Sequence, residues 1–107
     1  MIQKIGIIGT GMVGTALAKA FKNSGFDVYI NNRTHATALQ LAEEMRITHF
    51  QNLETLNQVD MVVIAVKDDA ITTVADQLLP FLDKQIVVHT SGTHSIDSLA
   101  SIPCRGL

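Results

Sequence analysis

The sequence has a single cysteine, Cys104. One cysteine cannot form a disulfide within its own chain, and it excludes a zinc site built from several cysteines. Disulfides are typical of oxidising compartments and rare in the cytosol. The scarcity of cysteine therefore favours a reducing setting, and we expect a cytoplasmic protein.

Charge and long apolar runs are also sparse. Only 17% of the 107 residues are charged, and the net charge is −2. A nucleic-acid-binding protein carries a clustered basic excess, so we expect no nucleic-acid partner. The apolar run at 61–66 is far shorter than the roughly 20 residues that span a bilayer, and no signal peptide is indicated before Lys4. We expect no membrane association.

What the sequence does have is a hydrophobic content of 47%. A chain of this length buries roughly 60–70% of its unfolded surface, so residues 1–107 are expected to form one domain. Dense Ile- and Val-rich runs that do not alternate with polar residues are typical of strands buried on both faces of a parallel sheet. These runs lie at 4–8, 27–30, 60–66 and 85–89, with a weaker one at 47–50.

Between the runs, apolar residues recur at helical spacing over 13–21, 38–45 and 71–82. Gly25 is expected to end the first helix in a left-handed conformation. Thr34 is expected to cap the second helix, and Asp68 or Asp69 the third. The alternation predicts an α/β fold, a doubly wound parallel (Rossmann) sheet with strand order 3-2-1-4-5. Residues 95–107 predict a short helix, which leaves no sequence for a sixth strand.

The segment Gly9-Thr10-Gly11-Met12-Val13-Gly14 matches the pattern G-x-G-x-x-G between a strand and a helix. Gly9 would allow the tight turn, Gly11 would let a pyrophosphate approach the backbone, and Gly14 would let the helix pack on the strand. Free N–H groups at the helix start would bind the phosphates. The alternative is that the glycines serve turning and packing alone. A P-loop is disfavoured, because no Lys follows the last glycine.

The end of the second strand discriminates between cofactors. NAD and FAD sites place an acidic residue about 20 residues after the glycines, whereas this chain has Asn32, Arg33 and Thr34. Their donors suit a 2′-phosphate, which a carboxylate would repel. We therefore predict NADP(H) as the cofactor. The alternative for Arg33 is a solvated surface residue.

Two further strand ends should face the same crevice. Val66 and Lys67 follow the fourth strand and would line the ribose and nicotinamide side. Thr90 and Ser91 follow the fifth and carry hydroxyls near the nicotinamide or substrate. His89 and Ser91 are the candidate catalytic residues, His89 as a proton donor, although His89 equally fits a hydrogen-bonded strand end. No pair of side chains has metal-ligand spacing, so no metal is expected.

Taken together, GTGMVGTALAKAF, NNRT, VDMVVIAVKDDAI and VVHTSG resemble the N-terminal domain of the NADP-dependent reductase superfamily. That superfamily includes pyrroline-5-carboxylate reductase, the deazaflavin-dependent NADP oxidoreductases and 6-phosphogluconate-type dehydrogenases. The ending His-Thr-Ser-Gly (89–92) is similar to one group of Rossmann-like oxidoreductases within it. The resemblance implies pyrophosphate binding at 9–14, 2′-phosphate binding at 32–34 and the ribose side at 66–68. Lys67 departs from the proline of many relatives.

Relatives of this kind carry a C-terminal helical domain that builds the substrate site, and this chain has no counterpart to it. We therefore expect the NADP(H)-binding domain of an oxidoreductase that acts on an imine or a carbonyl, truncated or completed by a partner. The alternative is a stand-alone NADP(H)-binding or regulatory module. A lone cofactor domain exposes apolar surface that its partner would cover, so a homo-oligomer is also expected.

Overall fold

A computed structural model of the chain describes residues 2–67, 70–90 and 104–106. The strands form one sheet with the order β3-β2-β1-β4-β5-β6, and every pairing is parallel. Their bounds are β1 Lys4–Ile8, β2 Asp27–Asn31, β3 Thr48–His49, β4 Met61–Ile64, β5 Ile86–His89 and β6 Cys104–Gly106. The predicted order 3-2-1-4-5 is confirmed.

The prediction that no sequence remains for a sixth strand is wrong. β6 pairs with β5 and places Cys104 beside Val87 and Gly106 beside His89. Such a short strand needs only a free edge on β5 and no apolar run of its own, so the hydrophobic pattern does not show it. The short helix predicted over 95–107 falls mainly on residues outside the described part, and its final residues form β6 instead.

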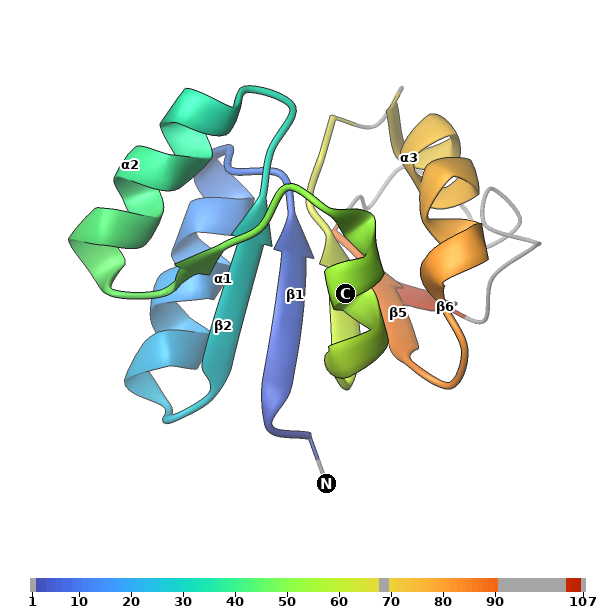
Figure 1. The fold of residues 1–107 in the computed structure, drawn as a ribbon, viewed down its shortest axis with the longest axis horizontal. Coiled ribbons are helices and arrows are strands. Elements are labelled where there is room, and N and C mark those ends of the chain that lie inside the picture. Colours follow the sequence, from blue (N-terminus) through green and yellow to red (C-terminus); the bar gives the residue numbers. More distant parts are fainter. Residues whose placement is uncertain (1, 68–69, 91–103, 107) are drawn as a thin grey trace.

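Helices cover both faces of the sheet (Figure 1). The α-helices are α1 Met12–Asn23, α2 His35–Met45 and α3 Ile71–Leu78, and the 3-10 helices are η1 Leu53–Gln58 and η3 Leu79–Phe81. Ala18 of α1 and Ala38 of α2 pack in one buried cluster with Val63 of β4. Ile71 of α3 packs in the opposite cluster with Val62 of the same strand. Successive β4 residues thus face opposite layers, as the period of a strand requires.

The ends of the helices follow local chemistry. Gly25 has φ +92°, which confirms the predicted left-handed stop after α1. Thr34 is the N-cap residue of α2, but its side chain makes no capping hydrogen bond. The N-cap residue of α3 is Ala70, and Asp68 and Asp69 lie outside the described residues. α3 ends earlier than predicted because Pro80 has no N–H to continue it, and η3 follows.

The interior is apolar. Among the residues that the structure describes, His89 is the one buried polar side chain, with 2% of its surface exposed. By the alternation of β5, it lies on the same face as Val87, the face that α3 covers. In the described ranges, no helix has both the length and the apolar character to cross a lipid bilayer.

Candidate functional site at the carboxyl edge of the sheet

The carboxyl ends of β1, β2, β4 and β5 are joined by backbone hydrogen bonds at one edge of the sheet (Figure 1). These bonds run from Gly9 N to Asn31 O (2.8 Å), from Ala65 N to Ile8 O (2.8 Å) and from Thr90 N to Ile64 O (3.2 Å). The segments at 9–14, 32–34 and 66–67 therefore leave the sheet along the same edge. In parallel sheets, ligands bind at this edge, beside the point where the strand order reverses.

Two of the glycines in the loop before α1 are required by packing. Gly9 has φ +105°, and a Cβ atom there would overlap the backbone carbonyl of Ala65. A Cβ atom at Gly14 would overlap the carbonyl oxygen of Gly9 and lie 3.2 Å from Cβ of Ala65. These contacts hold the start of α1 directly against the ends of β1 and β4, as the sequence predicts for the tight turn and the helix–strand contact.

Gly11 differs from the other two, because a Cβ atom there would meet no atom of the described residues within 4 Å. Gly11 is the N-cap residue of α1. No side chain in the described part of the chain caps this helix end, and no acidic residue lies in its first turn. The neighbouring Met12 and Val13 are 91% and 51% exposed. A helix start with free N–H groups and open space in front is a ready anion site, so the loop fits a pyrophosphate.

The loop after β2 lies beside this helix start. Arg33 and Thr34 are exposed, while Asn32 is partly buried and bonded to its surroundings. No Asp or Glu occurs between Val28 and Ala42, so no carboxylate on this stretch would repel a phosphate. A guanidinium beside a hydroxyl is the donor set that suits a 2′-phosphate.

The sequence analysis did not predict two contacts that link the end of β2 and the start of α2 to the segment around β3. The side-chain amide of Asn31 donates a hydrogen bond to the carbonyl oxygen of Phe50 (2.7 Å), which ties the end of β2 to the end of β3. The rings of His35 and His49 meet edge to face with centroids 5.8 Å apart. These residues are far apart in the chain, and no periodicity in the sequence pairs them.

The ends of β4 and β5 lead into the other residues that the sequence analysis proposes for the site. Val66 is partly buried against the interior, and its Cγ1 atom lies 3.1 Å from the Cβ position of Gly9. Lys67 is exposed and Thr90 is partly exposed, whereas Ser91 lies outside the described residues. The Nδ1 atom of His89 is buried, and none of the described residues forms a hydrogen bond with it. In the described part of the chain, no three His, Cys, Asp or Glu side chains come together as metal ligands.

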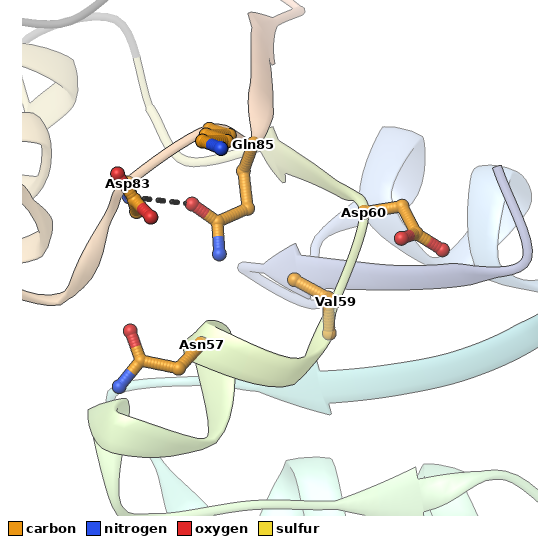
Figure 2. Close-up of a pocket in the computed structure, with 6 residues that line it drawn as sticks. Asn57, Val59, Asp60, Asp83 and Gln85 are labelled. Atoms are coloured by element: carbon orange, nitrogen blue, oxygen red, sulfur yellow. Dashed lines mark hydrogen bonds between the residues drawn. The ribbon is translucent and has the colours of Figure 1, made fainter. Parts of the chain in front are cut away.

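A hollow of about 370 Å³ lies elsewhere, at the amino ends of β4 and β5 (Figure 2). It is lined by Asn57, Val59, Asp60, Asp83, Lys84 and Gln85. The side chain of Gln85 accepts a hydrogen bond from Asp83 N (2.6 Å) and donates one to Leu56 O (2.8 Å). Because Gln85 is bonded within the protein and the hollow lies at the edge opposite the glycine loop, we assign no cofactor role to it.

Asp60, at the rim of this hollow, has a structural role. Its Oδ2 atom accepts hydrogen bonds from the backbone N–H groups of Lys4 and Gln3, each 2.9 Å long. These bonds, first that of Lys4 and then that of Gln3, hold the pKa of the Asp60 carboxyl below its ordinary value of 3.8. The Asp60 carboxylate, directly before β4, thus holds Gln3 and the first residue of β1 in place.

Comparison with known proteins relates this chain to a family. Residues 4–92 match the family described as NADP oxidoreductase, coenzyme F420-dependent. The chain is 34% identical over 95 residues to an NADPH-dependent reductive aminase from Aspergillus oryzae, a match that covers 87% of this chain and 32% of the aminase.

Solved structures share the fold. An imine reductase from Myxococcus stipitatus in complex with NADP+ has a TM-score of 0.74 and 25% identity, over 89% of this chain and 34% of the reductase. An arogenate dehydrogenase from Synechocystis has a TM-score of 0.84 and 21% identity, over 92% of this chain and 36% of the dehydrogenase. The chain spans about a third of the length of these relatives. The family match confirms the predicted resemblance to the NADP-dependent reductases.

Proposed function

The chain belongs to the family of NADP oxidoreductases described as coenzyme F420-dependent, and on that premise we propose that residues 1–107 are the NADP(H)-binding domain of an imine or carbonyl reductase. One observation supports this most directly. The uncapped start of α1, with open space at Gly11, lies beside a loop that bears Arg33 and no carboxylate. The two features together suit a dinucleotide with an additional phosphate.

Each part of the cofactor has proposed binding residues. The segment Gly9, Thr10, Gly11, Met12, Val13 and Gly14 would hold the pyrophosphate. The N–H groups from Gly11 onward would be the donors, and Gly9 and Thr10 would shape the loop, because their own N–H groups bond Asn31 O and Asn32 Oδ1. Arg33 and Thr34, with Asn32 in the same loop, would bind the 2′-phosphate. Val66, Lys67, Thr90 and Ser91 would line the ribose and nicotinamide side. Backbone N–H groups suit the pyrophosphate because they point along the dipole of α1, and Arg33 suits the 2′-phosphate because its planar fork can form paired hydrogen bonds.

The cofactor supplies the hydride that the reaction transfers; the residues of this chain bind it and fix its position. The names of the reductive aminase and the imine reductase support an imine as the substrate class. We propose that the substrate is held by a further domain or a partner chain, either in a longer chain or in a homo-oligomer. We also propose a cytoplasmic location, which the single cysteine supports.

His89 and Ser91 are the proposed candidates for proton delivery, but the structure describes only His89. Ser91 lies outside the described residues. His89 is 2% exposed, and it lies on the face of the sheet that α3 covers. This burial favours a role in supporting the end of β5 over proton transfer to a substrate.

Titration of the full chain with NADPH and with NADH tests the proposal, with the fluorescence of the reduced nicotinamide as the readout. We expect NADPH to bind more tightly than NADH, because the 2′-phosphate adds charge-assisted hydrogen bonds. Equal binding would overturn the choice of cofactor, and no binding of either would overturn the function. Tight NADPH binding fits both a reductase domain and a stand-alone binding module. Turnover of an imine or a carbonyl when a substrate-binding domain is supplied would favour the reductase domain.

A further inference from the structure

The side chain of Asn32 joins the two phosphate-binding segments of the proposed site. Its Oδ1 atom accepts a hydrogen bond from the backbone N–H of Thr10 in the glycine-rich loop, at 3.3 Å. Its Nδ2 atom donates a hydrogen bond to the carbonyl oxygen of Thr34, also at 3.3 Å. Both polar ends of the side chain are therefore engaged with protein atoms.

We propose that Asn32 is a positioning residue, which fixes the glycine-rich loop for the pyrophosphate and does not itself select the 2′-phosphate. The inference rests on the proposed function, since it concerns how the same site is held in place. The residues of the loop after β2 then have two different roles. Arg33 and Thr34 face solvent and can reach a ligand, whereas Asn32 acts through Thr10 and Thr34.

The surroundings of Thr10 explain why one side chain matters. The N–H of the preceding Gly9 is held by Asn31 O at 2.8 Å. The carbonyl oxygen of Thr10 accepts a hydrogen bond from the Thr15 hydroxyl at 3.0 Å. With the bond from Asn32 to its N–H, Thr10 is held at both of its backbone polar groups. This fixes the chain just before Gly11, where the free N–H groups of α1 begin.

A loop that is already ordered binds its ligand with a smaller entropic cost than one that must be ordered on binding. Removal of the Asn32 side chain should therefore weaken every ligand that uses the pyrophosphate loop, with or without a 2′-phosphate. Direct recognition predicts a different result. An amide nitrogen has a second N–H, and if it donated to the 2′-phosphate, only NADPH binding would suffer.

The experiment measures NADPH and NADH binding to the full chain for wild type, Asn32→Ala, Asn32→Asp and Arg33→Ala. We expect Asn32→Ala to weaken both cofactors by the same factor, roughly three- to tenfold, the range for one or two uncharged hydrogen bonds. Arg33→Ala is the matched direct-contact variant and should weaken NADPH alone. Asn32→Asp keeps an oxygen acceptor for Thr10 N–H, so NADH binding should return toward the wild-type level while NADPH binding falls.

Hydrogen exchange of the Thr10 amide in the cofactor-free protein gives a readout independent of binding. We expect faster exchange in Asn32→Ala than in wild type, and recovery in Asn32→Asp. Loss of NADPH binding alone in Asn32→Ala, or exchange unchanged at Thr10, would overturn the inference. If wild type binds neither cofactor, the proposed function fails, and Thr10 exchange still decides whether Asn32 positions the loop. If Asn32→Ala does not fold, exchange of the Thr10 amide in wild type decides the point. We expect this amide to be protected by its bond to Asn32 Oδ1, and exchange as fast as in an unstructured chain would overturn the inference.

Discussion

Gly14 of α1 lies directly against the carbonyl oxygen of Gly9, so closely that a Cβ atom at position 14 would overlap that oxygen. Replacement of Gly14 by Ala should destabilise the fold. Alanine would favour a helix by about 1 kcal/mol, but the contact is with backbone, which cannot rotate away. We expect the overlap to prevail, with a net loss of about 1–3 kcal/mol in the free energy of unfolding measured with urea. Stability equal to or above wild type would contradict this contact.

Gly11→Ala is the matched control in the same loop. It should weaken NADPH binding and leave the free energy of unfolding nearly unchanged. The φ of Gly11 is −71°, which alanine adopts readily, and a methyl group would have no atom of residues 2–67, 70–90 and 104–106 within 4 Å. The free energy of unfolding should stay within about 0.5 kcal/mol of wild type. NADPH binding should weaken by about tenfold, or 1.4 kcal/mol, because the methyl would occupy the path of the pyrophosphate. Unchanged affinity in a titration would argue against a ligand at this position.

Arg33→Ala should reduce selectivity between the two nicotinamide cofactors. A hydrogen bond to a charged group contributes about 1.5–3 kcal/mol, so NADPH affinity should fall by roughly ten- to 150-fold. NADH affinity should change little, because it lacks the 2′-phosphate. Lys19→Ala is the control, since Lys19 is an exposed cation in the second half of α1, near Lys22 and Glu44 and away from the start of that helix. An equal loss of NADPH binding in both variants would indicate general electrostatic attraction rather than a contact at Arg33.

Asp60→Asn should lower the stability of the folded protein at neutral pH. It should also make that stability fall less steeply as the pH is lowered. The pKa of Asp60 is lowered in the folded protein, so the unfolded chain binds the proton more readily. The contribution of the carboxylate is therefore present above the ordinary pKa of 3.8 and is lost as the pH falls through the lower folded value. Thermal unfolding of both proteins between neutral pH and pH 3 should show a steeper acid loss in wild type. Curves with the same pH dependence would contradict a stabilising role for the ionised Asp60 carboxylate.

Much of the fold could be predicted because the strands are dense apolar runs and the helices have one apolar stripe. Lys4–Ile8 is a strand over the predicted range, and α2 ends at Met45 as its spacing indicates. The pattern could not find η1, whose Leu53 and Leu56 are too few to define a period. It also could not find β6, which depends on an edge of β5 that exists only in the folded sheet.

The candidate site was predictable to a similar degree. The roles of Gly9 and Gly14 follow from a motif with a known geometry, and the structure places both glycines in contact as that geometry requires. The inward bonds of Asn32 could not be predicted, because they depend on how closely two loops approach after folding. The contact between His35 and His49 could not be predicted either, since it depends on how β3 packs against the first turn of α2.

The described sheet ends on β3 and β6, which are two and three residues long. An edge strand exposes unpaired N–H and C=O groups, and a long one serves as a template on which another chain can add a strand. Edges this short offer few such groups, so aggregation through edge-to-edge strand addition is disfavoured at both sides of the sheet. Association with another copy or domain would then depend on side chains from the helical layers or the carboxyl edge, and the backbone of the sheet would contribute little.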